Sequence, residues 1–349
     1  MLSRKGLILH AGIILLAVSL GSAAWSAETY ELRGGTEGNI KHPYAQAGQN
    51  FAKIVEAKSG GKIKSKWFHT GQIGGGLEII NQLQSGTIQF ATLSNANTGT
   101  INPKMMTMYT PYLIKDWDTL FNKWVGSEGA QLILDGLNSK GIMGLGWVPY
   151  GFNALCYIDP PIRKLEDAKG RKIRAAESYT IKGTLEALGF NAPPIPWPEV
   201  YQSIQQKVVE GCTTPPGMLM LSRLDEVVKN LTLSDHLFGT HVFFFREENF
   251  KKFPKDLQKV VTESILEACR QQQKEMKDLD DKSVESMKQK GIKIWTLSSE
   301  EKARWIAATK KVYFEHEKRI DQASGDGRVF MRTVFKSLGR DYDKEILGN

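Results

Sequence analysis

Strand-like and helix-like segments alternate over residues 29–94, and this order constrains the fold more than any other feature of the chain. The stretch YELRGG predicts a strand at 30–35, and residues 42–61 predict a helix with apolar side chains on one face. Further strands are expected at 62–69 and 87–94, with a short helix at 76–86 between them. Strands connected by helices usually pair in parallel, so these residues predict one α/β unit.

A second run of alternating segments follows, over about 142–216. Strands are expected at 170–176, 191–197 and 208–215, helices at 178–189 and 198–207, and one more strand at 237–245. The glycine-containing apolar run at 141–158 is too long for one plain strand, so we expect it to bend or to cross between domains. The chain is therefore predicted to be an α/β protein of two lobes with a cleft between them.

The C-terminal part is predicted to be mainly helical. Apolar residues such as Leu257, Val261 and Ile265 recur every three or four positions, and Gly291 ends the pattern. A helix over about 255–290 is longer than one domain requires, so we expect it to lie across both lobes. The predicted division is lobe I at 27–150, with part of the C-terminal region returning to it, lobe II at 151–245 and a helical region at 246–349.

The first 26 residues have the composition of a secretory signal peptide. Arg4 and Lys5 precede a short apolar stretch, and small residues follow it. No cysteine lies near the expected cleavage site to carry a lipid, so the sequence predicts a free periplasmic protein. Cys156 and Cys212 lie in strand-like segments and are candidates for a disulfide, but an odd total of three cysteines leaves at least one thiol free.

Charge and motifs exclude several classes of function. Without residues 1–26 the net charge falls from +8 to +6, and no basic run is interleaved with aromatic residues, so no nucleic-acid partner is expected. The chain has no G-x-S-x-G, H-E-x-x-H or C-x-x-C motif, no P-loop lysine, and no histidines at metal-ligand spacing. We therefore expect no enzymatic activity, no catalytic residue, no metal and no cofactor.

Arg174 is the most informative single residue, because it ends a strand-like segment among small residues. A guanidinium in a partly buried cleft needs a partner, and a carboxylate bound by two hydrogen bonds is its best one. That carboxylate can belong to a ligand or to an internal residue, Glu177, Glu199 or Glu210, and the residues alone do not decide between these alternatives.

Other candidates for ligand contact lie near the expected strand ends. Trp197 stands between two prolines, which restrict its backbone. Each aromatic residue can equally belong to the core, and each polar one to an ordinary turn. The further candidates are Trp147, Tyr150 and Phe152 in the long apolar run, and Thr36, Asn39, Ser94, Asn95 and Asn97 in the first lobe.

Three segments together resemble the solute-binding proteins of tripartite ATP-independent periplasmic (TRAP) transporters. They are PIRKLEDAKGRKIR at 161–174, PEVYQSIQQKVVEG at 198–211 and FPKDLQKVV at 253–261. The resemblance extends from about residue 30 to beyond 320. It implies a monomeric, two-lobed periplasmic binding protein of type II-like fold, which closes around a small organic acid. It also implies delivery of that acid to a permease with a small and a large integral membrane subunit.

The resemblance also implies roles for individual residues. Arg174 closes the K-G-x-K-x-R segment and would clamp the ligand carboxylate, while Trp197 would line the pocket. Many members have a second arginine where this chain has Asn153. The segment from Glu210 to Pro215 has Thr214 where an asparagine is common, so Glu210, Thr214 and Asn153 are further candidates.

One cation fewer argues against a dicarboxylate held at both ends. We therefore expect a monocarboxylate with an apolar or aromatic body. A C4-dicarboxylate, a neutral or zwitterionic solute, a sensor subunit and, less favoured, an exported enzyme remain alternatives.

Overall fold

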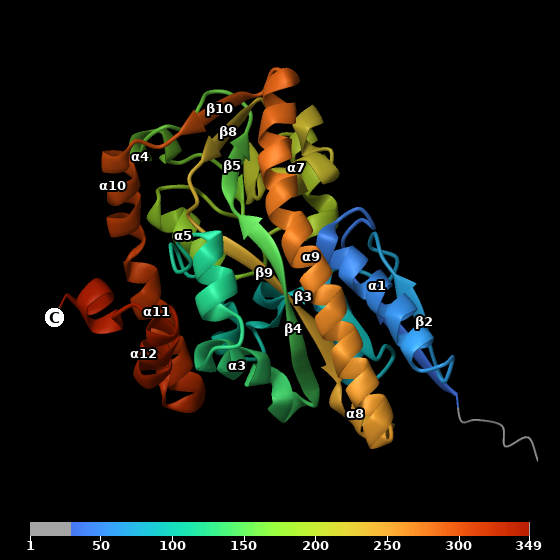
Figure 1. Ribbon diagram of the computed structural model, residues 1–349. Coiled ribbons are helices and arrows are strands. Elements are labelled where there is room, and N and C mark those ends of the chain that lie inside the picture. The colour runs from blue at the N-terminus through green and yellow to red at the C-terminus, as the bar shows by residue number, and fades with distance from the viewer. Residues whose placement is uncertain (1–28, 349) are drawn as a thin grey trace, which may run out of the picture.

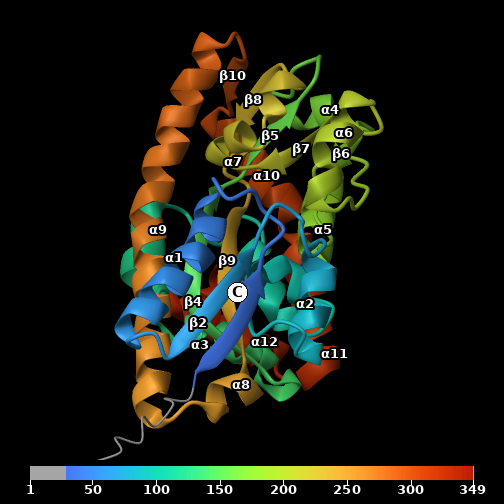
Figure 2. The same ribbon diagram turned by 90° about the vertical axis from the view of Figure 1, so that its right-hand side faces the viewer.

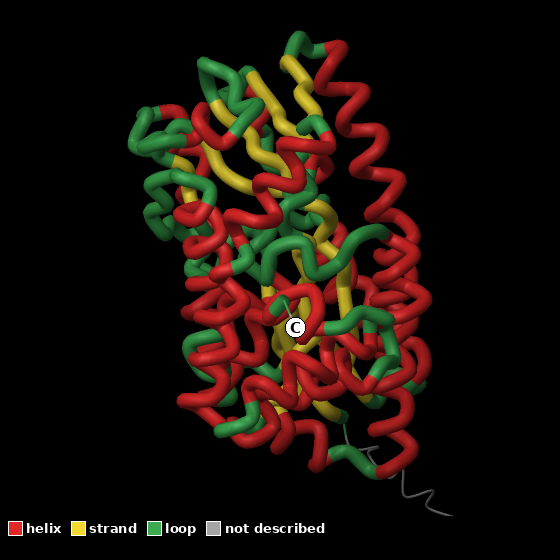
Figure 3. The backbone as a smooth tube through the Cα atoms, turned by 90° about the vertical axis from the view of Figure 1, so that its left-hand side faces the viewer, coloured by secondary structure: helices red, strands yellow, loops and turns green. Residues whose placement is uncertain are grey.

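The structure is a computed structural model that describes residues 29–348; the predicted signal peptide lies outside this range. Two five-stranded sheets, each with helices around it, form two lobes (Figures 1 and 3). The strands are β1 (Tyr30–Gly35), β2 (Ile63–Phe68), β3 (Phe90–Ser94), β4 (Ile142–Phe152), β5 (Ala154–Tyr157), β6 (Ile173–Arg174), β7 (Gly211–Thr214), β8 (Asn230–Leu233), β9 (Phe238–Arg246) and β10 (Lys293–Thr296). The helices are α1 (Pro43–Lys58), α2 (Gly76–Ser85), α3 (Glu128–Leu134), α4 (Leu165–Ala168), α5 (Tyr179–Ala187), α6 (Val200–Gln205), α7 (Pro216–Leu221), α8 (Glu247–Lys252), α9 (Lys255–Gln289), α10 (Ser299–Thr309), α11 (Lys311–Ser324) and α12 (Gly327–Ser337).

The first sheet has the strand order β2-β1-β3-β9-β4, and its first three strands are the α/β unit predicted at 29–94. β1 pairs in parallel with β2 and β3, whereas β9 is antiparallel to both β3 and β4. Both faces are covered: Phe243 and Phe245 pack in one buried cluster with residues of α1 and α9, and Phe244 packs in another. Alternate side chains of a strand point to opposite faces, which explains why β9 carries the uninterrupted apolar run 242–245.

The second sheet has the order β10-β8-β5-β7-β6 and differs from the parallel arrangement expected of it. β5 is antiparallel to both β7 and β8, while β6 is parallel to β7 and β10 is parallel to β8. The reason is that β5 enters this sheet directly from the first lobe and not through a crossover helix. The strand predicted at 191–197 is also wrong, since only two isolated bridges, at Asn191 and Pro194, form there.

The chain passes between the lobes at two adjacent strand connections. β4 belongs to the first sheet and β5 to the second, so the predicted crossing of the 141–158 run is confirmed. The chain returns between β8 and β9, and the Asn153 backbone N–H donates to the Leu237 carbonyl, 2.8 Å away, where the two connections meet. The predicted boundary of lobe II at 245 is therefore displaced, because β9 pairs in the first sheet.

Helix α9 lies along both lobes, as the sequence predicts. Its 35 residues span about 50 Å. It packs against α1 and β4 in the first lobe and against α7 and β10 in the second (Figures 1 and 2). β10 follows α9 and joins the second sheet, so the region predicted as helical contains one strand. Within residues 29–348, none of the helices has the length and apolarity needed to cross a bilayer.

The two candidate disulfide partners are neighbours across β5 and β7. Cys156 and Cys212 stand opposite each other in the antiparallel ladder, and their sulfur atoms lie 3.2 Å apart. The structure contains them as buried free thiols, and Cys269 is a third, in the cluster between α9 and the first sheet. The predicted possibility of pairing is thus compatible with the backbone, although the structure contains no bond.

Gly151, at the end of β4, gives the first testable prediction. Its φ of +116° disfavours any residue with a Cβ, and an added Cβ would lie 2.6 Å from Asp280 Oδ2 of α9. We expect Gly151→Ala to lower the free energy of unfolding by about 1–3 kcal/mol, measured by urea denaturation. The matched control is Gly126→Ala, at φ +86° with open space around it, which should lose only about 1 kcal/mol. Equal losses in the two variants would show that Asp280 does not restrict this connection.

Candidate functional site

A small cavity of about 50 Å³ lies between the two lobes where the connecting strands meet. Both lobes contribute to its wall, and Asn153 lies at the crossing itself. The residues from the first lobe are Glu37, Tyr44, Ser94, Asn97, Tyr109, Tyr150 and His241. Those from the second are Arg174, Ala176, Glu177, Ile181, Trp197 and Thr213. The cavity is therefore where a two-lobed protein would enclose a small ligand.

Arg174 ends β6 and reaches this cavity, although only 6% of its surface is exposed. Its Nε donates to the Ile195 carbonyl, 2.7 Å away, and its guanidinium carbon lies 5.5 Å from the centroid of the Trp197 ring. Within residues 29–348 this is the one hydrogen bond of the guanidinium, and no ion pair includes it. Burial lowers the pKa of Arg174, but an arginine keeps its charge in any such setting.

The internal partners considered for Arg174 are placed differently. Glu210 accepts from Arg171 Nε at 2.7 Å and from the Lys172 backbone N–H, outside the cavity wall. Glu177 lines the cavity, and burial raises its pKa while the charge of Arg174 opposes that rise. The candidate role of Glu210 in ligand contact is thus not supported by its position, because its carboxylate already pairs with Arg171.

Trp197 occupies the cavity wall from a 3-10 turn, Trp197–Glu199, and not from the end of a strand. Three other candidates also line the cavity: Ser94, proposed from its place at a strand end, Tyr150, from the long apolar run, and Asn153, from the resemblance. The Asn153 Oδ1 atom is buried and has no hydrogen-bond partner among the described residues. An amide oxygen in this state can accept from a ligand that carries a donor group.

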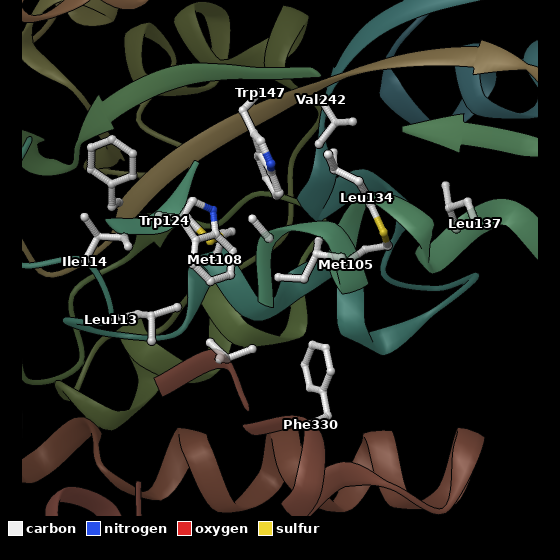
Figure 4. Close-up of a cluster of buried hydrophobic side chains, with 14 of the residues drawn as sticks. Met105, Met108, Leu113, Ile114, Trp124, Leu134, Leu137, Trp147, Val242 and Phe330 are labelled. Carbon is white, nitrogen blue, oxygen red and sulfur yellow. The ribbon is translucent and has the colours of Figure 1, made fainter. Parts of the chain in front are cut away.

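The remaining candidates lie outside this wall. Trp147 points from β4 into the core, with its ring centroid 6.0 Å from that of Trp124 (Figure 4). Phe152 packs edge-on against Phe238, at 4.8 Å between centroids. Both assignments to a ligand site are corrected by the fold, because these side chains point to the core face of the first sheet. Asn39 lies in a separate hollow nearer the surface, one that also includes Glu37 and Trp197.

The other polar candidates stabilise the scaffold around the cavity. The Thr36 hydroxyl donates to the Thr92 carbonyl at 2.7 Å, which ties β1 to β3. Asn95 donates to the Met105 carbonyl and accepts from the Thr240 hydroxyl. The Thr214 hydroxyl lies 3.1 Å from that of Tyr150, behind the wall. These side chains position neighbours of the cavity and do not face it.

Glu37 is the site residue that sequence reasoning missed. It stands in the GTEGN stretch after β1, between Thr36 and other candidates that were considered there. Its Oε2 accepts from the backbone N–H of Gly76, 2.9 Å away in the first turn of α2, and its Oε1 accepts from Asn97 Nδ2 at 3.4 Å. Burial raises the pKa of Glu37, and Arg174 is the largest influence that lowers it. The sequence signal that could have identified Glu37 was its position shortly after a predicted strand and directly before a glycine.

An aromatic and histidine cluster forms the first-lobe side of the wall and was also not predicted. The Tyr44 ring stacks on His241 with 3.9 Å between centroids. The Tyr44 hydroxyl lies 2.7 Å from His42 Nδ1, and His42 Nε2 lies 3.1 Å from the Ser222 hydroxyl. Because α1, β9 and α7 supply these residues, only the folded chain brings them together.

Comparison with known proteins gives consistent results. The sequence model of one protein family, the bacterial extracellular solute-binding proteins, family 7, matches residues 35–319 of this chain. The C4-dicarboxylate-binding protein DctB of Bacillus subtilis is 26% identical over 276 residues, or 79% of each chain. The ectoine-binding periplasmic protein TeaA of Halomonas elongata is 27% identical, covering 81% of this chain and 82% of its own length. A TRAP periplasmic solute-binding protein of Sulfurospirillum deleyianum, solved with bound succinate, is 30% identical with a TM-score of 0.80, covering 88% of this chain and 98% of that one.

Buried neutral histidines predict how stability depends on pH. Burial lowers the pKa of His42 to about 4 and that of His236, His241 and His316 to about 3. As the pH falls from 6.5 toward 4, these histidines bind protons in the unfolded chain but stay neutral in the folded chain, so stability falls on acidification. Each such proton is worth about 1.4 kcal/mol per pH unit. Three carboxyl groups whose pKa burial raises act in the opposite direction, Asp280 with a pKa of about 8 together with Glu37 and Glu177, but they stand against four histidines.

We therefore expect the melting temperature to be lower at pH 5 than at pH 7, measured by differential scanning calorimetry at constant ionic strength. His316 bridges the Thr107 hydroxyl at 2.9 Å and the Tyr179 hydroxyl at 2.7 Å without lining the cavity. A His316→Gln variant should be less stable at pH 7 and should lose less on acidification. A melting temperature that stays constant or rises between pH 7 and 5 would contradict this account.

Proposed function

The chain belongs to family 7 of the bacterial extracellular solute-binding proteins, and we propose that it captures a small organic acid by pairing the ligand carboxylate with Arg174. The position of Arg174 supports this proposal most directly. It is a buried guanidinium in the cavity wall, and it forms no ion pair with any residue that the structure describes. A carboxylate bound by two charge-assisted hydrogen bonds would supply the missing partner.

Capture is expected to couple to closure of the lobes. Arg174 and Trp197 belong to the second lobe, while Ser94 and Tyr150 belong to the first. A ligand favours the closed form only to the extent that it contacts both sides, and this cavity offers contacts from both. The closed protein would then present its ligand to the membrane subunits of a TRAP transporter. This role requires export, in agreement with the predicted signal peptide.

The lining argues for a compact acid that also carries polar groups. Ring surfaces of Trp197, Tyr109 and Tyr150 can support a flat or apolar part of the ligand. Asn97 and Thr213, which carry an amide and a hydroxyl group, line the same cavity, so a body with polar groups fits better than the apolar or aromatic body expected from sequence. Asn153 stands where many members have a second arginine, which leaves one cation in the wall for one carboxylate.

A dicarboxylate is the second candidate, because a 30% identical relative was solved with succinate. Two carboxylates in the wall, Glu37 and Glu177, would repel a second ligand carboxylate, so we favour the monocarboxylate. Mass spectrometry of the small molecule released from the purified protein by denaturation would distinguish these ligands directly.

Substitution of Arg174 tests the proposal. A panel of succinate, orotate, D-glucuronate and pantoate is screened by thermal shift, together with any acid that co-purifies. For the acid that binds best, we expect Arg174→Lys to raise Kd at least tenfold, or about 1.4 kcal/mol, by isothermal titration calorimetry. The reason is that an ammonium group cannot form the two parallel hydrogen bonds of a guanidinium. Arg174→Ala should lose more.

Arg171→Lys is the matched control, three positions earlier and paired with Glu210 outside the cavity. It should bind the same acid with a Kd within twofold of the parent protein. Unchanged affinity in Arg174→Ala, with the acid still bound in the cavity, would overturn the clamp.

A further inference from the structure

We infer that the ligand is a zwitterion, and that its cationic nitrogen binds Glu37 of the first lobe while its carboxylate binds Arg174 of the second. The inference rests on the proposed function and specifies the class of acid that the same site selects. It follows from the charges that line the cavity, from the way in which Glu37 is held, and from the lobes that the two residues belong to.

The charges in the wall do not favour a simple anion. Three charged side chains line the cavity: Arg174, Glu37 and Glu177. Within residues 29–348, none of them forms an ion pair with another residue. With all three ionised the wall carries one net negative charge, and a monocarboxylate would increase it to two. A zwitterion leaves the total unchanged and gives partners to both Arg174 and Glu37, which matters because unpaired charge in a closed site is costly.

The contacts of Glu37 favour its ionised form. The carboxylate accepts from the Gly76 backbone N–H at 2.9 Å and from the Asn97 amide at 3.4 Å. Both partners are donors, so they match a carboxylate that only accepts. Gly76 begins α2, a helix of 10 residues, whose N-terminal end also stabilises negative charge. Burial and the nearby Glu177 raise the pKa of Glu37, and Arg174 and the two hydrogen bonds oppose that rise.

The surroundings of Glu37 suit a cation better than a second anion. The rings of Tyr44 and Tyr109 line the same side of the cavity, and aromatic faces attract ammonium groups. The Asn153 Oδ1 atom, buried and unpartnered among the described residues, is a further acceptor for an N–H group. Among the lining residues, Arg174 of the second lobe is thus the cationic donor for a carboxylate, while the acceptors for a cation are Glu37 of the first lobe and Asn153 at the crossing.

The placement of the two charges also makes closure selective. Glu37 follows β1 in the first sheet, and Arg174 ends β6 in the second. A zwitterion that spans them contacts both lobes through charged groups, whereas a monoanion is held strongly by one lobe only. A ligand shifts the equilibrium toward the closed form only by binding that form more tightly than the open one. A zwitterion should therefore favour closure more strongly than a monoanion does.

Pairs of compounds that differ only in the cation test the inference. The probes are glycine betaine with 3,3-dimethylbutanoate, L-proline with cyclopentanecarboxylate, and L-pipecolate with cyclohexanecarboxylate. In each pair a cationic nitrogen replaces a carbon atom at nearly constant shape. Succinate and D-glucuronate represent dianionic and hydroxylated acids. Binding is measured by thermal shift and then by titration calorimetry at pH 7, on the protein without residues 1–26.

We expect at least one zwitterion to bind at least tenfold more tightly than its carbon analogue and than either of the two other acids. Glu37→Gln should remove most of this preference while leaving the affinity for the analogue unchanged or improved, because it removes a negative charge and keeps one accepting oxygen for the Gly76 N–H. Glu31→Gln, at an exposed position of β1, the strand that precedes Glu37, is the matched control and should keep the preference. Retained affinity for the carbon analogue, together with an unchanged melting temperature, would show that the Glu37→Gln variant is folded.

Several outcomes would overturn the inference. The first is that the carbon analogues or D-glucuronate bind as tightly as every zwitterion. The second is that the preference for the zwitterion over its analogue persists in Glu37→Gln. The third is that Glu177→Gln, and not Glu37→Gln, removes this preference. The Arg174→Lys variant distinguishes failure of the zwitterion inference from failure of the proposed carboxylate clamp. If anionic acids bind and lose affinity in Arg174→Lys, the carboxylate clamp stands and only the zwitterion is rejected. If no probe of any charge binds, both proposals fail.

Discussion

The two strand connections that run between the sheets, joined where Asn153 donates to the Leu237 carbonyl, are the constraint on which the rest of the structure depends. They hold the ends of β4, β5, β8 and β9 together, so the cavity opens directly beside them. Helix α9 packs against both lobes and limits how far they can separate. A ligand in the cavity would therefore contact the region that joins the lobes, and under the proposed function this would couple small-molecule binding to closure.

The cavity places charge of both signs in the wall instead of a single cation. Arg174 and Glu37 face the same space from different lobes, and each is held by hydrogen bonds that orient it without neutralising it. Their mutual attraction offsets part of the free-energy cost of burying each one. A ligand that binds between them must therefore interact with the two charges at least as favourably as they interact with each other. Under the two proposals, the site would select by how charges are spaced along the ligand, as well as by the presence of a carboxylate.

Much of the fold could be predicted from local patterns, and the errors have a common origin. The first α/β unit, the crossing at 141–158 and the long helix all follow from periodicity and from glycine positions. The strand β9 was assigned to the second lobe, and β10 was not predicted at all, because their partners, β3 and β8, are far away in the sequence. Trp147 was considered for the site because aromatic residues near a crossing can face either side, and the sheet directs its ring to the core.

The sequence by itself determined the family and the two-lobed α/β architecture, and it identified Arg174 and Trp197 as candidates for the site, because these follow from segments whose residues are adjacent in the chain. Only the tertiary structure decided what surrounds them. Glu37, Tyr44 and His241 come from three separate elements of the first lobe and meet Arg174 across the cavity. The charge balance of the site is a sum over these distant residues, so no local pattern contains it.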